Sequence, residues 1–340
     1  MKCAWNWNAA VAPRPDSEIA KKIRWGIIGA GRIAHSFASD IAATSNAELC
    51  AVAARSGDSA RAFAAQYHIP HAHEGYAALY GNPAVDAVYV ATPHSLHLAN
   101  CQQAILAGKS VLCEKPLVLD PDQAIALISA AQDSGQYLME GMWTWYLPAI
   151  RKAQAWVAAG RIGEVRHVKA DFGYPLPYSP DLREYDARVG GGCVLEMGIY
   201  PIAMARLFLP GEPRHIEAVG RTADNGVEDD VSAILDYGHA IATLSTSFRC
   251  KLPNWAYIIG TGGYIAIPDF WRADQCSLYY LDERIDHFEA PRETFGFNYQ
   301  IEEVSADILA GRKQSAVVPL ASSLALQRDM QAIRRIARAE

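Results

Sequence analysis

The stretch Ile23-Arg-Trp-Gly-Ile-Ile-Gly-Ala-Gly-Arg-Ile-Ala34 decides the fold of the N-terminal half of the chain. Its apolar start, Ile23–Ile28, predicts a strand buried on both faces, and the residues that follow repeat apolar side chains at helical spacing. Between strand and helix, Gly29 allows a tight turn, and Gly31 lets the backbone approach a pyrophosphate at the helix N-terminus. The alternative is a glycine turn without a ligand. We expect a dinucleotide cradle made of Gly29, Gly31, Arg32 and Ile33.

Short apolar runs alternate with helical patterns as far as Trp145. Strands are expected at Ile23–Ile28, Leu49–Ala54, Val85–Ala91, Val111–Cys113 and Tyr137–Met139. Helices are expected at Leu96–Ala107 and Pro121–Ser134. Strand–helix–strand alternation is typical of a doubly wound parallel sheet with right-handed crossovers. The sequence therefore predicts an α/β chain that begins with a Rossmann dinucleotide-binding domain over residues 23–145.

The period of the pattern changes in the second half, residues 146–340, after one helix at Ala149–Ala159. Strands are expected at Ile216–Gly220, Val231–Tyr237, Ala242–Phe248, Tyr257–Ile259 and Ile265–Ile267. A final helix is expected over residues 321–338. These segments predict an α+β domain with a large, open, mainly antiparallel sheet that is covered on one face. Residues 1–22 precede both domains as an extension that is either a disordered tail or an arm packing on a partner subunit.

Composition narrows the class of protein. The chain has 340 residues, a net charge of −6 and 51% hydrophobic residues, as in an ordinary globular protein, and no basic patch for nucleic acid. No apolar run approaches the roughly 20 residues that cross a bilayer. The N-terminus lacks the apolar core of a secretory signal, so we expect a cytoplasmic protein. Seven cysteines are scattered without metal-ligand spacing, which favours free thiols and no metal site.

Ala53-Ala54-Arg55-Ser56 ends the second predicted strand, where an acidic residue would hold the adenosine ribose of NAD. A carboxylate would repel a 2′-phosphate, whereas Arg55 can bind one bidentately and Ser56 can donate to it. Arg32 could close the other side of the adenine. The alternative for Arg55 is a solvated surface side chain. The residues therefore favour NADP, with NAD possible.

Two strings follow the ends of later strands, at the edge where such sheets bind ligands. In the first, Thr92 and Pro93 should border the nicotinamide ribose, and His97 is either a ligand contact or a helix cap. In the second, Lys115 can bond a substrate hydroxyl and place positive charge where an alkoxide develops, unless it is a plain surface lysine. Glu114 could bond a ribose hydroxyl or pair with Lys115.

A third string, Gly190-Gly-Gly-Cys-Val-Leu-Glu196-Met-Gly-Ile-Tyr200, adds a carboxylate and a phenol. On a helix, Glu196 and Tyr200 share a face. A nearby Lys115 ammonium would lower the phenol pKa, making Tyr200 a general base for oxidation and a general acid for reduction. The alternative for Tyr200 is a packed core residue. The expected catalytic residues are Lys115, Tyr200 and Glu196. Trp143, like Tyr200, is expected at the substrate, or else it only packs at a domain interface.

Together these residues resemble the glucose–fructose oxidoreductase/inositol dehydrogenase (Gfo/Idh/MocA) family, from Ile23 to the C-terminal helix. The segments most similar to its dimeric dihydrodiol dehydrogenase and NADP-dependent D-xylose dehydrogenase branch are Ala53–Arg55, Leu112–Pro116, Leu138–Thr144 and Gly190–Tyr200. The resemblance implies a Rossmann domain and an open-faced sheet through which subunits associate as a homodimer or higher oligomer. It also implies hydride transfer at a carbon whose hydroxyl Lys115 and Tyr200 contact.

The chain departs from that pattern at two positions. Glu196 stands where the branch usually has Asp, and Tyr200 stands where many sugar-oxidising relatives have His. The expected function is an NADP-dependent oxidoreductase acting on a secondary alcohol of a sugar, polyol or trans-dihydrodiol. Two alternatives stay open: a non-catalytic dinucleotide sensor or regulator of the same fold, and a sugar oxidoreductase that keeps NADP permanently bound.

Overall fold

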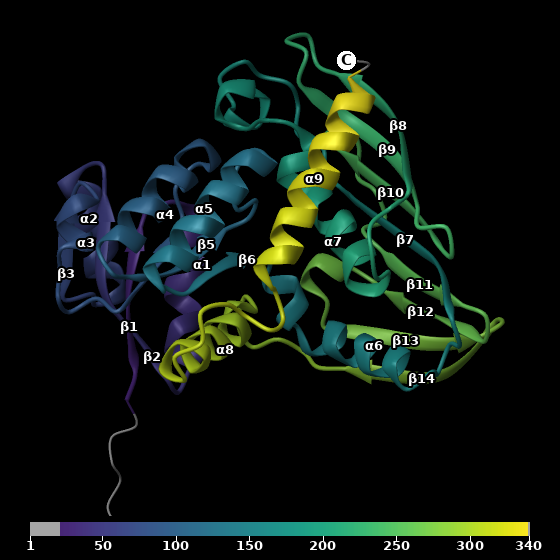
Figure 1. Cartoon of the computed structure of the whole chain (residues 1–340), viewed down its shortest axis with the longest axis horizontal. Coiled ribbons are helices and arrows are strands. Elements are labelled where there is room, and N and C mark those ends of the chain that lie inside the picture. Colours follow the sequence, from purple (N-terminus) through teal and green to yellow (C-terminus); the bar gives the residue numbers. More distant parts are fainter. Residues whose placement is uncertain (1–20, 339–340) are drawn as a thin grey trace, which may run out of the picture.

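The computed structural model describes residues 21–338, so the predicted extension 1–22 lies almost entirely outside the described residues. Its first half is a six-stranded, all-parallel sheet in the order β3-β2-β1-β4-β5-β6, which lies on the left of Figure 1. The strands are β1 Ile23–Ile28, β2 Ala47–Ala54, β3 His71–Glu74, β4 Ala87–Val90, β5 Ser110–Glu114 and β6 Leu138–Gly141. The predicted doubly wound sheet is confirmed. Strand β3 escaped prediction because its His-Ala-His-Glu sequence contains no apolar run.

Helices join and cover these strands. They are α1 Arg32–Asp40, α2 Gly57–Tyr67, α3 Ala77–Tyr80, α4 His97–Leu106 and α5 Pro121–Ser134. Asp120 caps α5 by accepting the amide N–H of Gln123 at 2.9 Å, with Pro121 at the first helical position. Both predicted helices of this half are confirmed, with α4 starting one residue later than expected.

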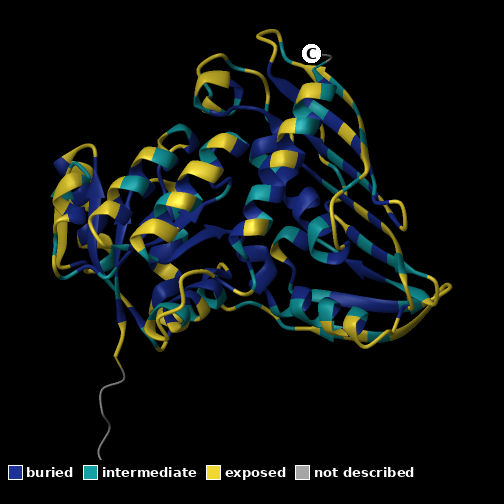
Figure 2. Cartoon of the chain, viewed as in Figure 1, coloured by how far each residue is buried: buried dark blue, intermediate teal, exposed yellow. Residues whose placement is uncertain are grey.

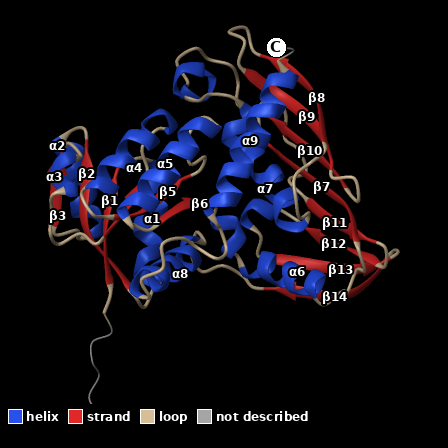
Figure 3. Cartoon of the chain, viewed as in Figure 1, coloured by secondary structure: helices blue, strands red, loops and turns tan. Residues whose placement is uncertain are grey.

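The second half contains an eight-stranded sheet in the order β14-β13-β12-β11-β7-β10-β9-β8, drawn in red beside the first sheet in Figure 3. The strands are β7 Val165–Gly173, β8 His215–Thr222, β9 Glu228–Asp236, β10 Ile241–Ser247, β11 Ala256–Gly260, β12 Gly263–Ile267, β13 Gln275–Tyr280 and β14 Glu283–Glu289. β7 and β10 pair in parallel and the other neighbours are antiparallel. The mainly antiparallel sheet is confirmed, but β7, β13 and β14 were not predicted, because charged and polar side chains interrupt their apolar alternation.

Among residues 21–338, the helices that pack on this sheet lie on one of its faces. They are α6 Pro148–Ala158, α7 Ile199–Phe208 and α9 Leu320–Ala337. Side chains toward the helices, such as Val168 and Ile258, are buried, whereas Ile234 and Val219 on the open face are exposed, and Figure 2 shows this alternation along the strands. The predicted covered and open faces are therefore confirmed.

Two helices connect the halves of the molecule. α9 packs against β8 and α7 on one side and against α5 and β6 on the other, and α8 (Phe297–Leu309) packs against α1 and β1. The domain ranges 1–22, 23–145 and 146–340 stay a prediction. Within residues 21–338, no helix has both the length and the hydropathy to cross a membrane.

Candidate active site

The turn after β1 has the geometry of a phosphate cradle. Gly29 has φ +91°, and a Cβ there would lie 2.7 Å from the carbonyl oxygen of Ala91. At Gly31, the N-cap of α1, a Cβ would meet nothing within 4 Å. The backbone amides at the start of α1 therefore face open space large enough for a ligand. These residues fit the pyrophosphate of a dinucleotide.

Two adjoining cavities, of about 530 and 550 Å³, follow the carboxyl ends of the parallel strands and share Gly31, Ala91, Thr92 and Pro93. One extends to Lys115 and the other to Arg55. The predicted cofactor residues that line them are Gly29, Gly31, Arg32, Ile33, Arg55, Ser56, Thr92, Pro93, Glu114 and Lys115. Together they form one elongated cleft with the cradle at its middle, which matches the outline of a dinucleotide.

The Arg55 end of the cleft is open to solvent. Arg55 and Ser56 are exposed, and Ser56 caps α2 by accepting the amide N–H of Ser59 at 3.4 Å. Tyr76 lies beside Arg55; burial raises the pKa of this phenol, and the guanidinium opposes that shift. None of the described residues that line this cavity is acidic, so no carboxylate lines the cavity beside Arg55 within the described part of the chain.

Lys115 lies at the opposite end, directly after β5. Its Nζ donates to the backbone carbonyl of Glu196 at 2.8 Å and stands 5.1 Å from the centroid of the Tyr200 ring. Burial lowers the pKa of Lys115, and the carboxylates of Glu196 and Glu114 oppose that shift. Glu114 is buried and accepts the hydroxyl of Tyr89. The structure thus brings Lys115 and two carboxylates together at one end of the cleft, with the Tyr200 ring packed beside Lys115.

Tyr200 is buried, and its hydroxyl oxygen accepts the indole N–H of Trp143 at 3.1 Å. Burial raises the pKa of Tyr200, and the charge of Glu114 raises it further. The predicted lowering of this pKa is wrong, because the Lys115 ammonium lies over the ring face instead of beside the hydroxyl and burial disfavours the phenolate. In this state Tyr200 is a proton donor.

Glu196 lies in a π-helical turn, Val194–Gly198, that runs directly into α7. A face shared with Tyr200 stays a prediction, but the turn that carries Glu196 is a π-helix in place of the predicted α-helix. The Glu196 carboxylate instead accepts both guanidinium nitrogens of Arg183, at 2.6 and 3.3 Å, and lies 3.6 Å from Nδ1 of His94. Glu196 therefore anchors the loop that carries Arg183 across the cleft.

Of the two histidines after β4, the structure buries His97 and places His94 at the cleft. His97 is fully buried, with Nδ1 2.9 Å from the Pro116 carbonyl and Nε2 2.8 Å from the Thr92 carbonyl, so the expected ligand contact is wrong. Its side chain caps no helix either. His94 lines the cleft instead, and burial holds its pKa well below the usual range. Sequence reasoning expected the loop 171–188 to form a pocket wall but named neither Arg183, Glu184 nor His94, although His94 directly follows Pro93 at a strand end.

Aromatic side chains surround the Tyr200 hydroxyl. Trp143 stacks on Phe297 with ring centroids 5.0 Å apart, and Phe172 meets Tyr200 edge-on at 5.3 Å. Trp271 approaches both Trp143 and Tyr200. Neither Trp143 nor Tyr200 lines either of the two cavities. A direct contact of these two residues with substrate stays a prediction.

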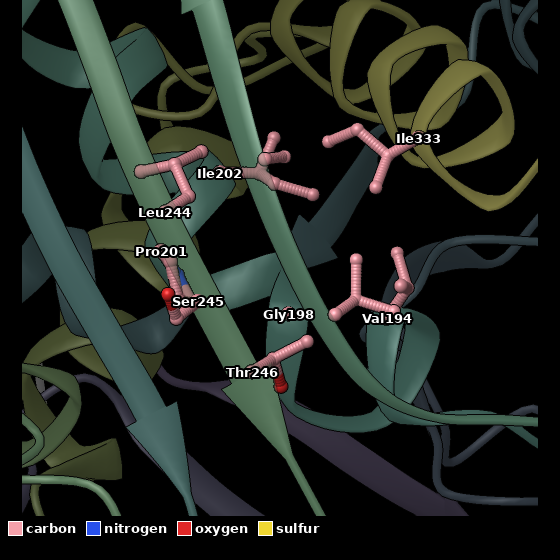
Figure 4. A pocket seen from close by; sticks show the side chains of 10 residues that line it. Val194, Gly198, Pro201, Ile202, Leu244, Ser245, Thr246 and Ile333 are labelled. Atoms are coloured by element: carbon pink, nitrogen blue, oxygen red, sulfur yellow. The ribbon is translucent and has the colours of Figure 1, made fainter. Parts of the chain in front are cut away.

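A separate crevice of about 10 Å³ lies behind the π-helical turn, between α7, α9 and the second sheet (Figure 4). Figure 4 shows mainly apolar side chains converging on it, among them Ile202, Leu244 and Ile333. It is too small and too apolar for a sugar.

This fold and cleft define a dinucleotide-binding oxidoreductase. Residues 23–142 match the oxidoreductase family with an NAD-binding Rossmann fold, and residues 150–266 match the GFO/IDH/MocA C-terminal domain. The chain belongs to the Gfo/Idh/MocA family, which confirms the resemblance drawn from the motifs.

Individual relatives agree with this assignment. A trans-1,2-dihydrobenzene-1,2-diol dehydrogenase of Mus musculus is 34% identical over 325 residues, covering 92% of this chain and 96% of the relative. A crystal structure of KijD10, a 3-ketoreductase from Actinomadura kijaniata in complex with NADP and TDP-benzene, superposes with a TM-score of 0.83 at 30% identity, covering 92% of this chain and 97% of that one. An aldose-aldose oxidoreductase from Caulobacter crescentus superposes with a TM-score of 0.86 at 27% identity, covering 94% and 98%.

Proposed function

We propose that the protein is an NADP-dependent oxidoreductase that interconverts a secondary alcohol of a sugar, polyol or trans-dihydrodiol with its carbonyl form. The observation that carries the proposal is the buried Tyr200 ring beside Lys115, which lines one end of a cleft whose other end presents Arg55. The dihydrodiol dehydrogenase and ketoreductase relatives support this substrate range. A cytoplasmic location stays a prediction.

The bound nicotinamide would supply or accept the hydride, and the protein would handle the proton. Tyr200 accepts the Trp143 N–H at its oxygen, so its own proton remains to donate to a substrate oxygen during reduction. Lys115 would stabilise the negative charge that develops on that oxygen. Glu196 would hold the Lys115 ammonium through its backbone carbonyl and the cleft loop through Arg183.

The choice of NADP rests on the Arg55 end of the cleft. Arg55 and Ser56 provide donors for a 2′-phosphate, and the cavity they line contains no carboxylate among its described residues. The first experiment is optical measurement of NADP⁺ and NAD⁺ reduction with aldoses, inositols and a trans-dihydrodiol. Turnover with NADP⁺ on one class supports the proposal, whereas tight NADP binding without turnover on any of them favours a dinucleotide sensor.

Permanent retention of NADP is a second candidate, favoured by the ion pair between Arg183 and Glu196. Arg183 and Glu184 belong to the loop after β7 and line the cleft together with the cradle. The ion pair between Arg183 and Glu196 would therefore hold this loop in place beside a bound cofactor. Absorbance of the reduced nicotinamide in freshly purified protein tests for retention. A spectrum free of nucleotide would indicate a cofactor that dissociates in each turnover.

We also propose that the open face of the second sheet pairs with a second copy of the chain. Its exposed apolar side chains include Val219, Ile234 and Ile241, and Trp255 stacks on Tyr257 next to the same face. An apolar surface of this kind is an aggregation hazard unless it is covered. Sedimentation equilibrium distinguishes the expected dimer or larger assembly from a monomer.

A further inference from the structure

Three buried polar side chains hold the backbone directly after Lys115. His97 of α4 faces the Pro116 carbonyl at 2.9 Å, Glu140 of β6 accepts the Leu117 N–H at 2.7 Å, and Gln327 of α9 donates to the Val118 carbonyl at 2.8 Å. The three side chains are 0%, 0% and 1% exposed. Each comes from a different element, and together they bind three consecutive residues of one turn.

These three side chains fix the position of the turn after Lys115 more strongly than packing alone would. A buried polar group is costly unless it is hydrogen-bonded, so the turn cannot shift without leaving at least one buried partner unsatisfied. The other end of Lys115 is also held, because its Nζ donates to the Glu196 carbonyl. The place of the ammonium in the cleft is therefore set by the turn at one end and by Glu196 at the other.

Helix α9 contributes to this turn from the second half of the molecule. Besides Gln327, its Ser323 lies next to the Glu140 carboxyl group. Neither Glu140 Oε2 nor Ser323 Oγ has a hydrogen-bond partner among residues 21–338. The buried Glu140 carboxyl group therefore lies between the Lys115 turn, which it binds through Oε1, and α9.

We propose that Glu140 and Gln327 are positioning residues for Lys115, which place its ammonium in the cleft by fixing the backbone of Leu117 and Val118 from β6 and α9. The proposal rests on the catalytic role proposed for Lys115. If it holds, the activity of Lys115, which follows a strand of the first sheet, depends on helix α9. The ionisable groups that act on Glu140 are Lys115 and Glu114, and Oε1 can accept the Leu117 N–H whether or not the carboxyl group is protonated.

The test compares Glu140→Ala, Glu140→Gln and Gln327→Leu in the full-length protein. We expect Glu140→Ala to lower kcat about 10²-fold with the NADP Kd within about twofold, because a catalytic group displaced by about 1 Å costs that much. Glu140→Gln retains an acceptor for Leu117 and should restore kcat to within about threefold of wild type. Gln327→Leu, which leaves the Val118 carbonyl unpaired, should lower kcat about tenfold.

Asp329→Ala is the matched control. Like Glu140, Asp329 is a buried carboxylate, but it lies on α9 and accepts the Arg206 Nε–H at 2.5 Å, with no bond to the Lys115 turn. It should lower the Tm while kcat stays within about twofold. Equal losses of kcat in Asp329→Ala and Glu140→Ala would overturn the inference, as would a Glu140→Gln variant no better than Glu140→Ala. If Glu140→Ala does not fold, an unchanged kcat in Gln327→Leu overturns it.

Lys115→Ala, measured on the same substrate, separates this inference from the proposed function. Retained turnover in Lys115→Ala means that the proposed role of Lys115 has failed, and the inference fails with it. Loss of turnover in Lys115→Ala with unchanged kcat in the Glu140 and Gln327 variants leaves the proposed function standing and removes only the positioning role.

Discussion

The two sheets of this molecule use their strands in different ways. All six strands of the first sheet run in one direction, so Arg55 after β2, Thr92 after β4 and Lys115 after β5 meet at one edge although they are far apart in the sequence. Most neighbours in the second sheet run in opposite directions, and no single edge collects their ends. That sheet acts through its faces, since Phe172 on β7 supports Tyr200 on α7. A parallel sheet brings functional side chains together at one edge, whereas an antiparallel sheet provides a broad face that supports other elements.

The largest effect on kcat is expected from Lys115→Ala, and Lys109, at the opposite end of β5, provides its matched control. Lys115→Ala removes positive charge at the carboxyl end of the strand and should lower kcat about 10³-fold. Lys109 precedes the same strand and donates to the carbonyls of Asn82 and Val85, at 2.9 and 2.8 Å. Lys109→Ala should reduce the Tm and leave kcat within about twofold. Steady-state kinetics and thermal unfolding of both variants check this, and a comparable loss of kcat in both would contradict the edge argument.

Tyr200→Phe tests whether Tyr200, on α7 in the second half of the molecule, donates the proton to the substrate oxygen. It should lower kcat about 10²–10³-fold while NADP binds normally. Because burial raises the Tyr200 pKa, carbonyl reduction in wild type should stay active across neutral pH and oxidation should rise with increasing pH. Tyr237→Phe is the control, because Tyr237 is also buried but its hydroxyl has no hydrogen-bond partner among the described residues. A pH-independent oxidation rate in wild type would remove Tyr200 from proton transfer.

Glu140 should make the stability of the parallel sheet depend on pH. Burial raises its pKa from the ordinary 4.5 to about 7, so between these values the folded state holds a proton that the unfolded state has lost. Stability from this group is complete below pH 4.5 and is lost as pH rises through 7, by up to about 3 kcal/mol. Glu140→Gln does not titrate. Urea unfolding of both proteins from pH 4.5 to 8 should show wild type losing stability relative to the variant, and parallel curves would contradict this.

The smallest effect is expected at the Arg55 end of the cleft. Arg55→Ala should raise the KM for NADP⁺ about tenfold and change the KM for NAD⁺ little, because it removes donors for the 2′-phosphate only. Arg61→Ala is the control, since Arg61 is exposed on α2 and pairs with Asp58. Titration of both cofactors into each variant measures the difference. An equal loss of affinity for both cofactors would show that Arg55 does not discriminate between them.

The sequence allowed the first sheet to be predicted better than the second. Strands buried on both faces, such as Ile23–Ile28, are continuous apolar runs that stand out from helices and turns. Strand β7 carries exposed charged and polar residues at Arg166, His167 and Lys169, and its alternation was not recognised. The cradle and the Lys115 turn were predictable because glycine and proline turns are local features that follow a recognisable strand.

By itself, the sequence was enough to predict the glycine turn after β1, the parallel sheet of the first half and the proximity of Lys115 and Tyr200. These features depend on local conformation and on where strands end, and both are encoded in short segments. Only the tertiary structure decided that Glu196 pairs with Arg183, that His94 and not His97 faces the cleft, and that burial raises the Tyr200 pKa. It also decided that α9 holds the turn after Lys115. These outcomes depend on distances between segments remote in the sequence and on the loss of solvent around charged groups, which no local pattern records.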